Sequence, residues 1–180
     1  MSIKYLLGIV SLCVVIFLGI ISINSMESGK KVVKKVVFEE FSPCLPKIKL
    51  SQQELLEPDE VKVSKAQKLC DNVEKSLKTL SGSHRDPEEL WLSLKRALLA
   101  EEFLKNCKNQ QGTLLIRTID LKSELQKTQK EWVKDLQMEV VRYRRQKKDK
   151  EVLFCLRRLL RLVPDEKHPY HQKWLKETSS

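Results

Sequence analysis

The hydrophobic pattern separates one long apolar stretch from a series of amphipathic segments. Residues 5–23 carry no charge over nineteen consecutive positions. As a helix rising about 1.5 Å per residue they would be about 28 Å long, close to the hydrocarbon core of a bilayer. The run is longer than the apolar core of a typical secretory signal, and the best cleavage site, at residues 23–25, is poor. An uncleaved single-pass signal-anchor is therefore favoured, with a cleaved signal or a buried soluble helix as alternatives.

Beyond residue 50 the apolar positions recur at the three- and four-residue spacings of helices. The pattern predicts an all-α body with helices at 58–80, 87–110, 113–146, 152–163 and 169–177. The short connection between the first two predicts an antiparallel hairpin. The third could bend near residues 126–130, where its pattern is entirely polar.

Local signals define several helix ends. Asp86 and Pro87 suit the N-cap and first position of a helix, with Glu89 at N3, and Gly112 is the expected stop of the same helix. Ser51 and Glu54 have the spacing of a capping box, which predicts a short helix ending before Pro58.

The chain therefore divides into three predicted parts. Residues 1–25 form the anchor, residues 26–57 a basic juxtamembrane segment with a proline-containing linker, and residues 58–180 a helical domain of antiparallel hairpins or a small bundle. Two prolines within residues 42–46 prevent a helix from propagating through the linker.

The net charge of +10 favours acidic partners of the protein, lipid or nucleic-acid class. Four juxtamembrane lysines are candidate contacts for anionic lipid: Lys30, Lys31, Lys34 and Lys35. Their excess over the N-terminal side of the apolar run favours a cytoplasmic domain, whereas the short N-terminal head is typical of anchors that export the following chain. The side of the membrane is left open.

No residue pattern predicts a catalytic or metal site. Nucleotide-binding glycine loops and the common hydrolase and metalloprotease motifs do not occur, so an enzyme is the least favoured class and no cofactor is expected. Ser83, His84 and Asp86 are too close in sequence to converge as a triad, so capping by Asp86 is favoured. His168 and His171 have the spacing of a possible pair of metal ligands. No cysteine or carboxylate pattern nearby in the sequence completes such a site, so it is not favoured.

The cysteines do not form a CxxC pair, which argues against zinc. Cys70, Cys107 and Cys155 each lie among apolar residues on a predicted helix face. Buried free thiols are favoured, with two disulfides involving also Cys44 as the alternative in an oxidising compartment.

Residues 142–161 contain nine basic and two acidic side chains. The simplest interpretation is a solvated helix face, and the alternatives are an acidic protein groove, anionic lipid and, least favoured, nucleic acid. The candidate binding face consists of Arg142, Arg144, Arg145, Lys147, Lys148, Arg157, Arg158 and Arg161.

Residues 143–164 resemble part of one tetratricopeptide repeat. Tyr143 precedes Pro164 by the interval that separates a late first-helix aromatic from the repeat-closing proline, and a polar turn and an apolar helix lie between them. No second copy occurs at a period near 34 residues. The resemblance implies a helix-turn-helix surface for protein interaction at the C-terminal end.

These observations lead to two hypotheses. In the first, the chain is a membrane-anchored helical adaptor that binds a protein partner through its helix grooves and its long helix, with Trp132 and Leu136 as candidate interface residues. In the second, it is a membrane-bound basic module that binds anionic lipid, nucleic acid or another acidic partner through residues 142–161.

Overall fold

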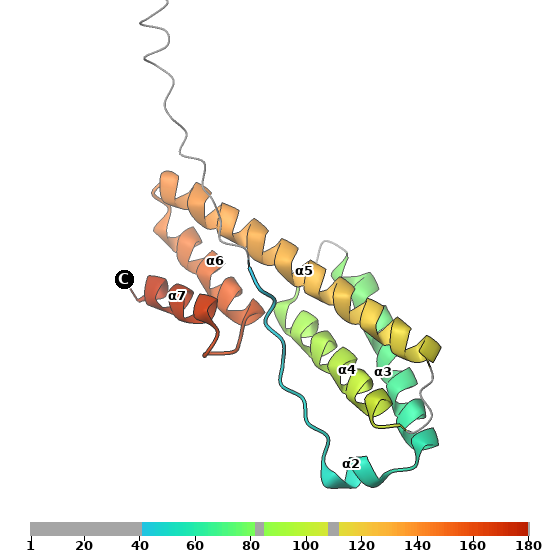
Figure 1. Cartoon of the computed structure of the whole chain (residues 1–180). Coiled ribbons are helices and arrows are strands. Elements are labelled where there is room, and N and C mark those ends of the chain that lie inside the picture. Colours follow the sequence, from blue (N-terminus) through green and yellow to red (C-terminus); the bar gives the residue numbers. More distant parts are fainter. Residues whose placement is uncertain (1–40, 82–84, 108–111, 180) are drawn as a thin grey trace, which may run out of the picture. The chain divides into compact units, whose positions relative to one another are not determined.

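The computed structural model describes residues 41–81, 85–107 and 112–179, and all regular structure in these ranges is helical. The prediction of an all-α body is confirmed. The helices are α2 (Gln52–Leu56), α3 (Asp59–Leu80), α4 (Pro87–Lys105), α5 (Gly112–Arg145), α6 (Asp149–Leu162) and α7 (Pro169–Thr178), as shown in Figure 1.

The predicted anchor at 5–23 and the four juxtamembrane lysines lie outside the described residues, as do Ser83 and His84. Among the helices that are described, none combines the length and the apolarity that a membrane crossing requires.

Two helix starts follow from the predicted caps. Ser51 accepts a hydrogen bond from the backbone N–H of Glu54 at 3.3 Å, and the Glu54 carboxylate accepts one from the Ser51 N–H at 2.8 Å, which completes the capping box of α2. Asp86 accepts bonds from Glu88 and Glu89 N–H at the start of α4. The Glu89 side chain instead bonds Ser76 of α3 at 2.5 Å and Arg96 at 3.0 Å, so it ties α3 to α4.

The expected end of α4 was wrong. This helix ends at Lys105, and Gly112 is the first residue of α5 rather than a stop. Asn106 ends α4 because its side-chain amide donates to the Glu102 carbonyl at 2.8 Å, while buried Lys62 binds the Asn106 carbonyl at 3.3 Å. These contacts satisfy C-terminal carbonyls that would otherwise lack partners.

Helix α5 connects the two ends of the helical body. Its N-terminal part packs against α3 and α4, its C-terminal part packs antiparallel to α6, and α7 packs against α6 (Figure 1). The helix is continuous through residues 126–130, where a bend is predicted, and Gln129 is fully buried there and donates to the Leu162 carbonyl at 2.8 Å. The core includes Leu94 of α4, Leu125 and Val133 of α5, and Leu159 of α6.

The predicted linker packs on the helical domain. Residues 41–50 form no helix or strand, yet Phe41 is 7% exposed and Cys44 is 2% exposed. The Phe41 ring lies 5.4 Å from that of Tyr170 on α7, centre to centre, in an edge-on arrangement. One compact unit therefore extends over residues 40–180.

Candidate functional site

The turn between α5 and α6 orients the basic run that the sequence singles out. Lys147 adopts a left-handed conformation with φ of 55°, and the Lys148 N–H donates to the Tyr143 carbonyl at 3.0 Å. This six-to-one bond closes the C-terminus of α5 in the manner of a Schellman motif. Helix α6 then starts at Asp149, earlier than predicted, and returns along α5.

Helix α6 has one buried face and one strongly cationic face. Its buried residues are Val152, Cys155, Leu156, Leu159 and Leu162. The opposite side carries Lys150, Phe154, Arg157 and Arg161 at helical spacing, and we call these four residues the α6 outer face. The Phe154 side chain is 62% exposed, a large value for an aromatic residue.

Within the described part of the chain, the side chains of Lys150, Arg157 and Arg161 make no ion pair or hydrogen bond. Asp149 and Glu151 are the only acidic residues of α6 and lie in its first turn. The surface around Phe154 is therefore positively charged and open to a partner.

A pocket of about 540 Å³ lies beside this face. We call it the arginine pocket, and it is lined by Arg85, Asp135, Met138, Glu139, Arg142 and Arg158. Four of these residues lie on α5 at spacings of three, one and three, so they share one side of that helix. Arg158 comes from α6 and Arg85 from the segment just before α4.

The three guanidinium groups of the arginine pocket have different partners. Arg85 pairs with Asp135 at 2.8 Å and lies 5.9 Å from the centre of the Trp132 ring. Arg158 donates to the Arg85 carbonyl at 3.2 Å. Arg142 lies 4.8 Å from the centre of the Tyr143 ring and donates to its hydroxyl at 3.0 Å. Within the described residues, neither Arg142 nor Arg158 pairs with a carboxylate.

Cys155 lies beneath the pocket and donates its thiol proton to Glu139 at 3.5 Å. Burial, followed by the hydrogen bond and the negative charge of Glu139, raises the pKa of this thiol to about 11. The thiol is therefore protonated at neutral pH, which makes it a poor nucleophile.

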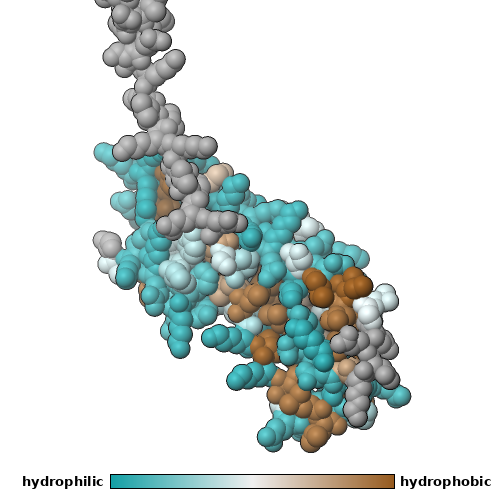
Figure 2. All heavy atoms as spheres, in the orientation of Figure 1, coloured by the Kyte–Doolittle hydropathy of each residue, from teal (hydrophilic) through white to brown (hydrophobic). Residues whose placement is uncertain are grey.

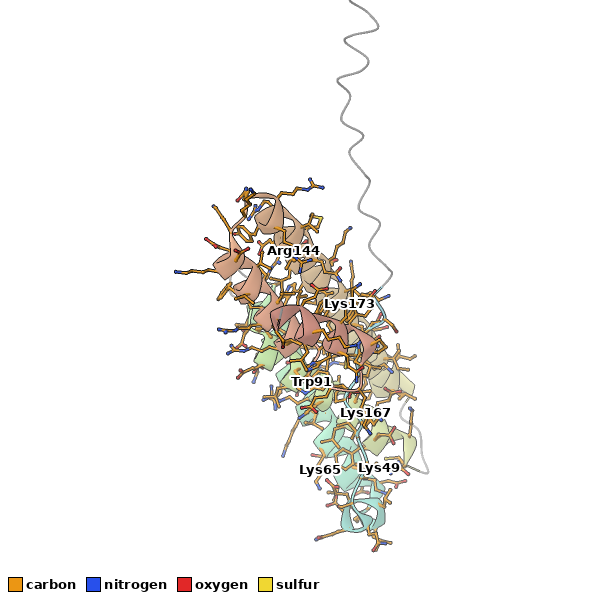
Figure 3. The ribbon with its side chains drawn as sticks, turned by 90° about the vertical axis from the view of Figure 1, so that its left-hand side faces the viewer. Lys49, Lys65, Trp91, Arg144, Lys167 and Lys173 are labelled. Atoms are coloured by element: carbon orange, nitrogen blue, oxygen red, sulfur yellow. The ribbon has the colours of Figure 1, made fainter. Side chains whose placement is uncertain are left out.

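The remaining predicted basic residues are divided between two surfaces. Arg145, Lys147 and Lys148 are exposed around the α5–α6 turn. Arg144 instead belongs to the row of cations labelled along the face in Figure 3, and its guanidinium pairs with Glu177 of α7 at 2.7 Å. In the same row Lys65 pairs with Glu57 at 2.6 Å, and Lys173 lies over the Tyr170 ring. Several cations of this row are thus held by the protein itself.

The two residues expected at a partner interface are buried. Trp132 and Leu136 are each 5% exposed and belong to the core between α5 and its neighbours. Arg85 lies over the Trp132 ring and pairs with Asp135, so these two charged side chains, and not Trp132, are presented to a partner here.

Sequence reasoning missed Phe154, Met138 and Arg85. Phe154 lies in the segment predicted as an apolar helix, and its position opposite Val152 and Leu159 already places it on the outer side. Met138 is 49% exposed. Arg85 enters the pocket through a tertiary contact that spacing along one helix cannot reveal.

The cysteines and histidines among the described residues have structural roles in this fold. Cys70, Cys107 and Cys155 are buried free thiols, as expected, and Cys44 is a buried free thiol as well. His168 caps α7 by accepting from the Tyr170 N–H at 3.3 Å, and His171 Nδ1 lies 2.6 Å from the Val163 carbonyl oxygen. Within the described ranges no group of three or more histidine, cysteine or carboxylate side chains could hold a metal ion.

The segment that resembles a tetratricopeptide repeat forms a helix-turn-helix from the end of α5 to Pro164. Comparison of the whole chain with protein-family models, curated proteins and solved structures gave no match. The relation to that repeat family stays a prediction.

Proposed function

We propose that this chain is a membrane-anchored helical adaptor that binds an acidic segment of a partner protein through the α6 outer face. The observation that carries the proposal is a 62%-exposed phenylalanine among three cations whose side chains make no hydrogen bond or ion pair within the described residues. Aromatic and arginine side chains are the residues most enriched at the energetic centres of protein interfaces.

The composition of the surface favours a protein over a purely ionic ligand. Burying Phe154 would contribute on the order of 2 kcal/mol from apolar area alone, and this contribution persists at high salt. The surrounding cations would speed association and select acidic sequences in a salt-dependent manner. A partner segment with carboxylates on both sides of an apolar residue satisfies both requirements.

The membrane part of the proposal is supported by the uncharged run at 5–23 and the lysines that follow it. An anchored adaptor would concentrate its partner at a bilayer surface. In the second candidate function, the same cations would bind anionic lipid or nucleic acid directly. Crosslinking from position 154 distinguishes this function from the binding of a protein partner.

The test places a photoreactive amino acid at position 154 of the full-length chain in its native membrane. The matched control carries the same amino acid at position 120, an exposed site at the other end of the helical body. We expect position 154 to give a protein adduct that maps to an acidic segment, and position 120 not to give it. The double reversal Arg157→Glu/Arg161→Glu should abolish the adduct.

Three results would contradict the proposal. Adducts with lipid or nucleic acid alone at position 154 would favour the second candidate function. An adduct that persists after the double charge reversal would show that the cations do not select the partner. Equal adducts from positions 154 and 120 would show that the α6 outer face has no special role.

A further inference from the structure

We infer that the arginine pocket receives one carboxylate side chain of the partner segment, with a glutamate side chain as its best ligand. This inference rests on the proposed function, because the pocket adjoins the α6 outer face. It adds the chemical identity of the group that is recognised and the residues that recognise it.

The pocket's charge favours one monoanion. Its lining contains three arginines and two carboxylates, a net charge of +1. Asp135 is paired with Arg85 at 2.8 Å, and Glu139 accepts from the Cys155 thiol. One bound carboxylate would neutralise the site, whereas a phosphate dianion would leave an excess negative charge beside Glu139.

Two guanidinium groups are available to hold that carboxylate. Arg158 has the Arg85 carbonyl as its hydrogen-bond partner, and Arg142 has the Tyr143 hydroxyl. Both partners are neutral. Guanidinium groups bind carboxylates through short charge-assisted hydrogen bonds, so replacing these neutral partners by a carboxylate would be favourable.

The shape of the pocket favours glutamate over aspartate. Met138 is 49% exposed and contributes an apolar side chain to the lining. The two methylene groups of a glutamate could pack against it, whereas aspartate has one. The volume of about 540 Å³ lies within the ordinary range of ligand pockets and holds a whole side chain.

The pocket and the α6 outer face are continuous through one side chain. The Arg158 guanidinium lies 5.8 Å from the centre of the Phe154 ring and also lines the pocket. A segment that covers Phe154 with an apolar residue can therefore place a neighbouring acidic residue at Arg158. The recognised pattern would be an apolar residue close to a glutamate.

The test measures binding of short acetylated peptides to the full-length protein in detergent micelles by calorimetry. The probe peptide alternates glutamate and leucine, and matched peptides replace glutamate by aspartate, glutamine or phosphoserine. We expect the glutamate peptide to bind best. Arg142→Gln and Arg158→Gln should each weaken its binding by about tenfold or more, as for a lost charge-assisted hydrogen bond.

Arg145→Gln is the matched control for Arg142→Gln, because Arg145 is exposed on the last turn of the same helix outside the pocket. It should weaken binding by no more than about twofold. Glu139→Gln should strengthen glutamate-peptide binding by about threefold and improve phosphoserine binding further, because it removes a like charge. An unchanged unfolding temperature shows that each variant is folded.

The outcomes separate the two claims. If Arg142→Gln and Arg158→Gln weaken binding no more than Arg145→Gln does, while Arg157→Glu/Arg161→Glu abolishes it, the pocket inference is overturned and the proposed function survives. Tighter binding of the phosphoserine peptide by the unmodified protein would also overturn the inference. If the unmodified protein binds none of the acidic peptides, both claims fail.

Discussion

Near the N-terminal end of α5, Arg117 and Lys122 are held by carboxylates from other helices. In contrast, the exposed Arg157 and Arg161 of α6 make no ion pair among the described residues. Arg117 pairs with Asp71 at 2.9 Å and Glu74 at 2.7 Å on α3. Lys122 pairs with buried Glu101 of α4 at 2.6 Å. Burial opposes ionisation of Glu101, but hydrogen bonds from Lys105 and Lys122 outweigh it and hold the pKa of this carboxyl below its ordinary value.

The contrast separates cations that hold helices together from cations that are available to a ligand. Figure 2 shows a related difference on one face of the molecule, where hydrophobic residues gather over the end that contains α2 and the start of α5 while the other end is largely hydrophilic. A high positive charge therefore identifies a binding surface only where no carboxylate of the same fold neutralises it.

The largest effect on stability is expected from Trp132→Ala, in the core beneath the arginine pocket. Removing an indole that is 5% exposed should lower the free energy of unfolding by about 3–5 kcal/mol. Chemical denaturation of the full-length chain measures the loss. A change below about 1 kcal/mol would contradict the assignment of Trp132 to the core.

Lys122→Met and Arg161→Met compare a paired cation with an outward one. Lys122→Met leaves buried Glu101 with Lys105 as its remaining ion-pair partner and should lower the free energy of unfolding by about 2 kcal/mol. The second should change the stability by less than about 0.5 kcal/mol. The denaturant midpoints of the two variants, compared where the denaturant dependence of the unfolding free energy is unchanged, measure both losses. Equal losses would show that paired and outward cations do not differ in their contribution to stability.

Alkaline pH should destabilise the fold through Cys155. The pKa of its thiol is about 11 in the folded state against 9.0 without the protein environment, so the unfolded chain loses its proton first as the pH rises. The stability that this raised pKa contributes to the fold is fully present below pH 9 and should fall by about 1.4 kcal/mol by pH 10. Unfolding curves at pH 7 and pH 10 measure it.

Glu139→Gln should reduce this alkaline loss, because Glu139 contributes to the raised pKa of Cys155 after burial itself. Cys155→Ala removes the Cys155 contribution altogether and serves as the control. The pKa values of Cys44, Cys70 and Cys107 are also raised by burial and act in the same direction. An equal loss in wild type and Cys155→Ala would rule out Cys155 as a contributor.

The smallest effect on stability, within about 0.5 kcal/mol, is expected from Arg157→Glu/Arg161→Glu, since both side chains are exposed and make no hydrogen bond or ion pair among the described residues. The same double variant is expected not to bind the acidic partner segment. Thermal unfolding and partner capture, measured on one preparation, test both statements. A large loss of stability would mean that these arginines serve the fold.

Local chemistry made most of the helices predictable from the sequence. Caps such as Ser51 with Glu54 and Asp86 act over a few residues, so the starts of α2 and α4 could be read directly. The end of α4 could not, because it depends on Lys62, which lies 44 residues before Asn106. Gln129 is buried in a polar stretch for the same reason, since its partner is the carbonyl of Leu162 on α6.

The candidate site was only partly predictable. Charge density identified the region of Arg157 and Arg161, and helical spacing would have placed Phe154 beside them. Trp132 and Leu136 were predicted at an interface because a helix as long as residues 113–146 is expected to pack on a partner or on several helices in turn. The structure shows the second, since α3, α4 and α6 all pack on α5 and both residues are buried. The arginine pocket required Arg85, whose position follows from tertiary packing alone.

A charge-swap rescue between the α6 outer face and the acidic segment identified by crosslinking at position 154 tests whether these cations select the partner. Binding of the full-length Arg157→Glu/Arg161→Glu variant is measured against the partner and against the partner with its acidic residues replaced by lysine. We expect the reversal to abolish binding to the native partner and the lysine-substituted partner to restore it. Undiminished binding of the variant to the native partner would show that the α6 outer face does not select an acidic segment.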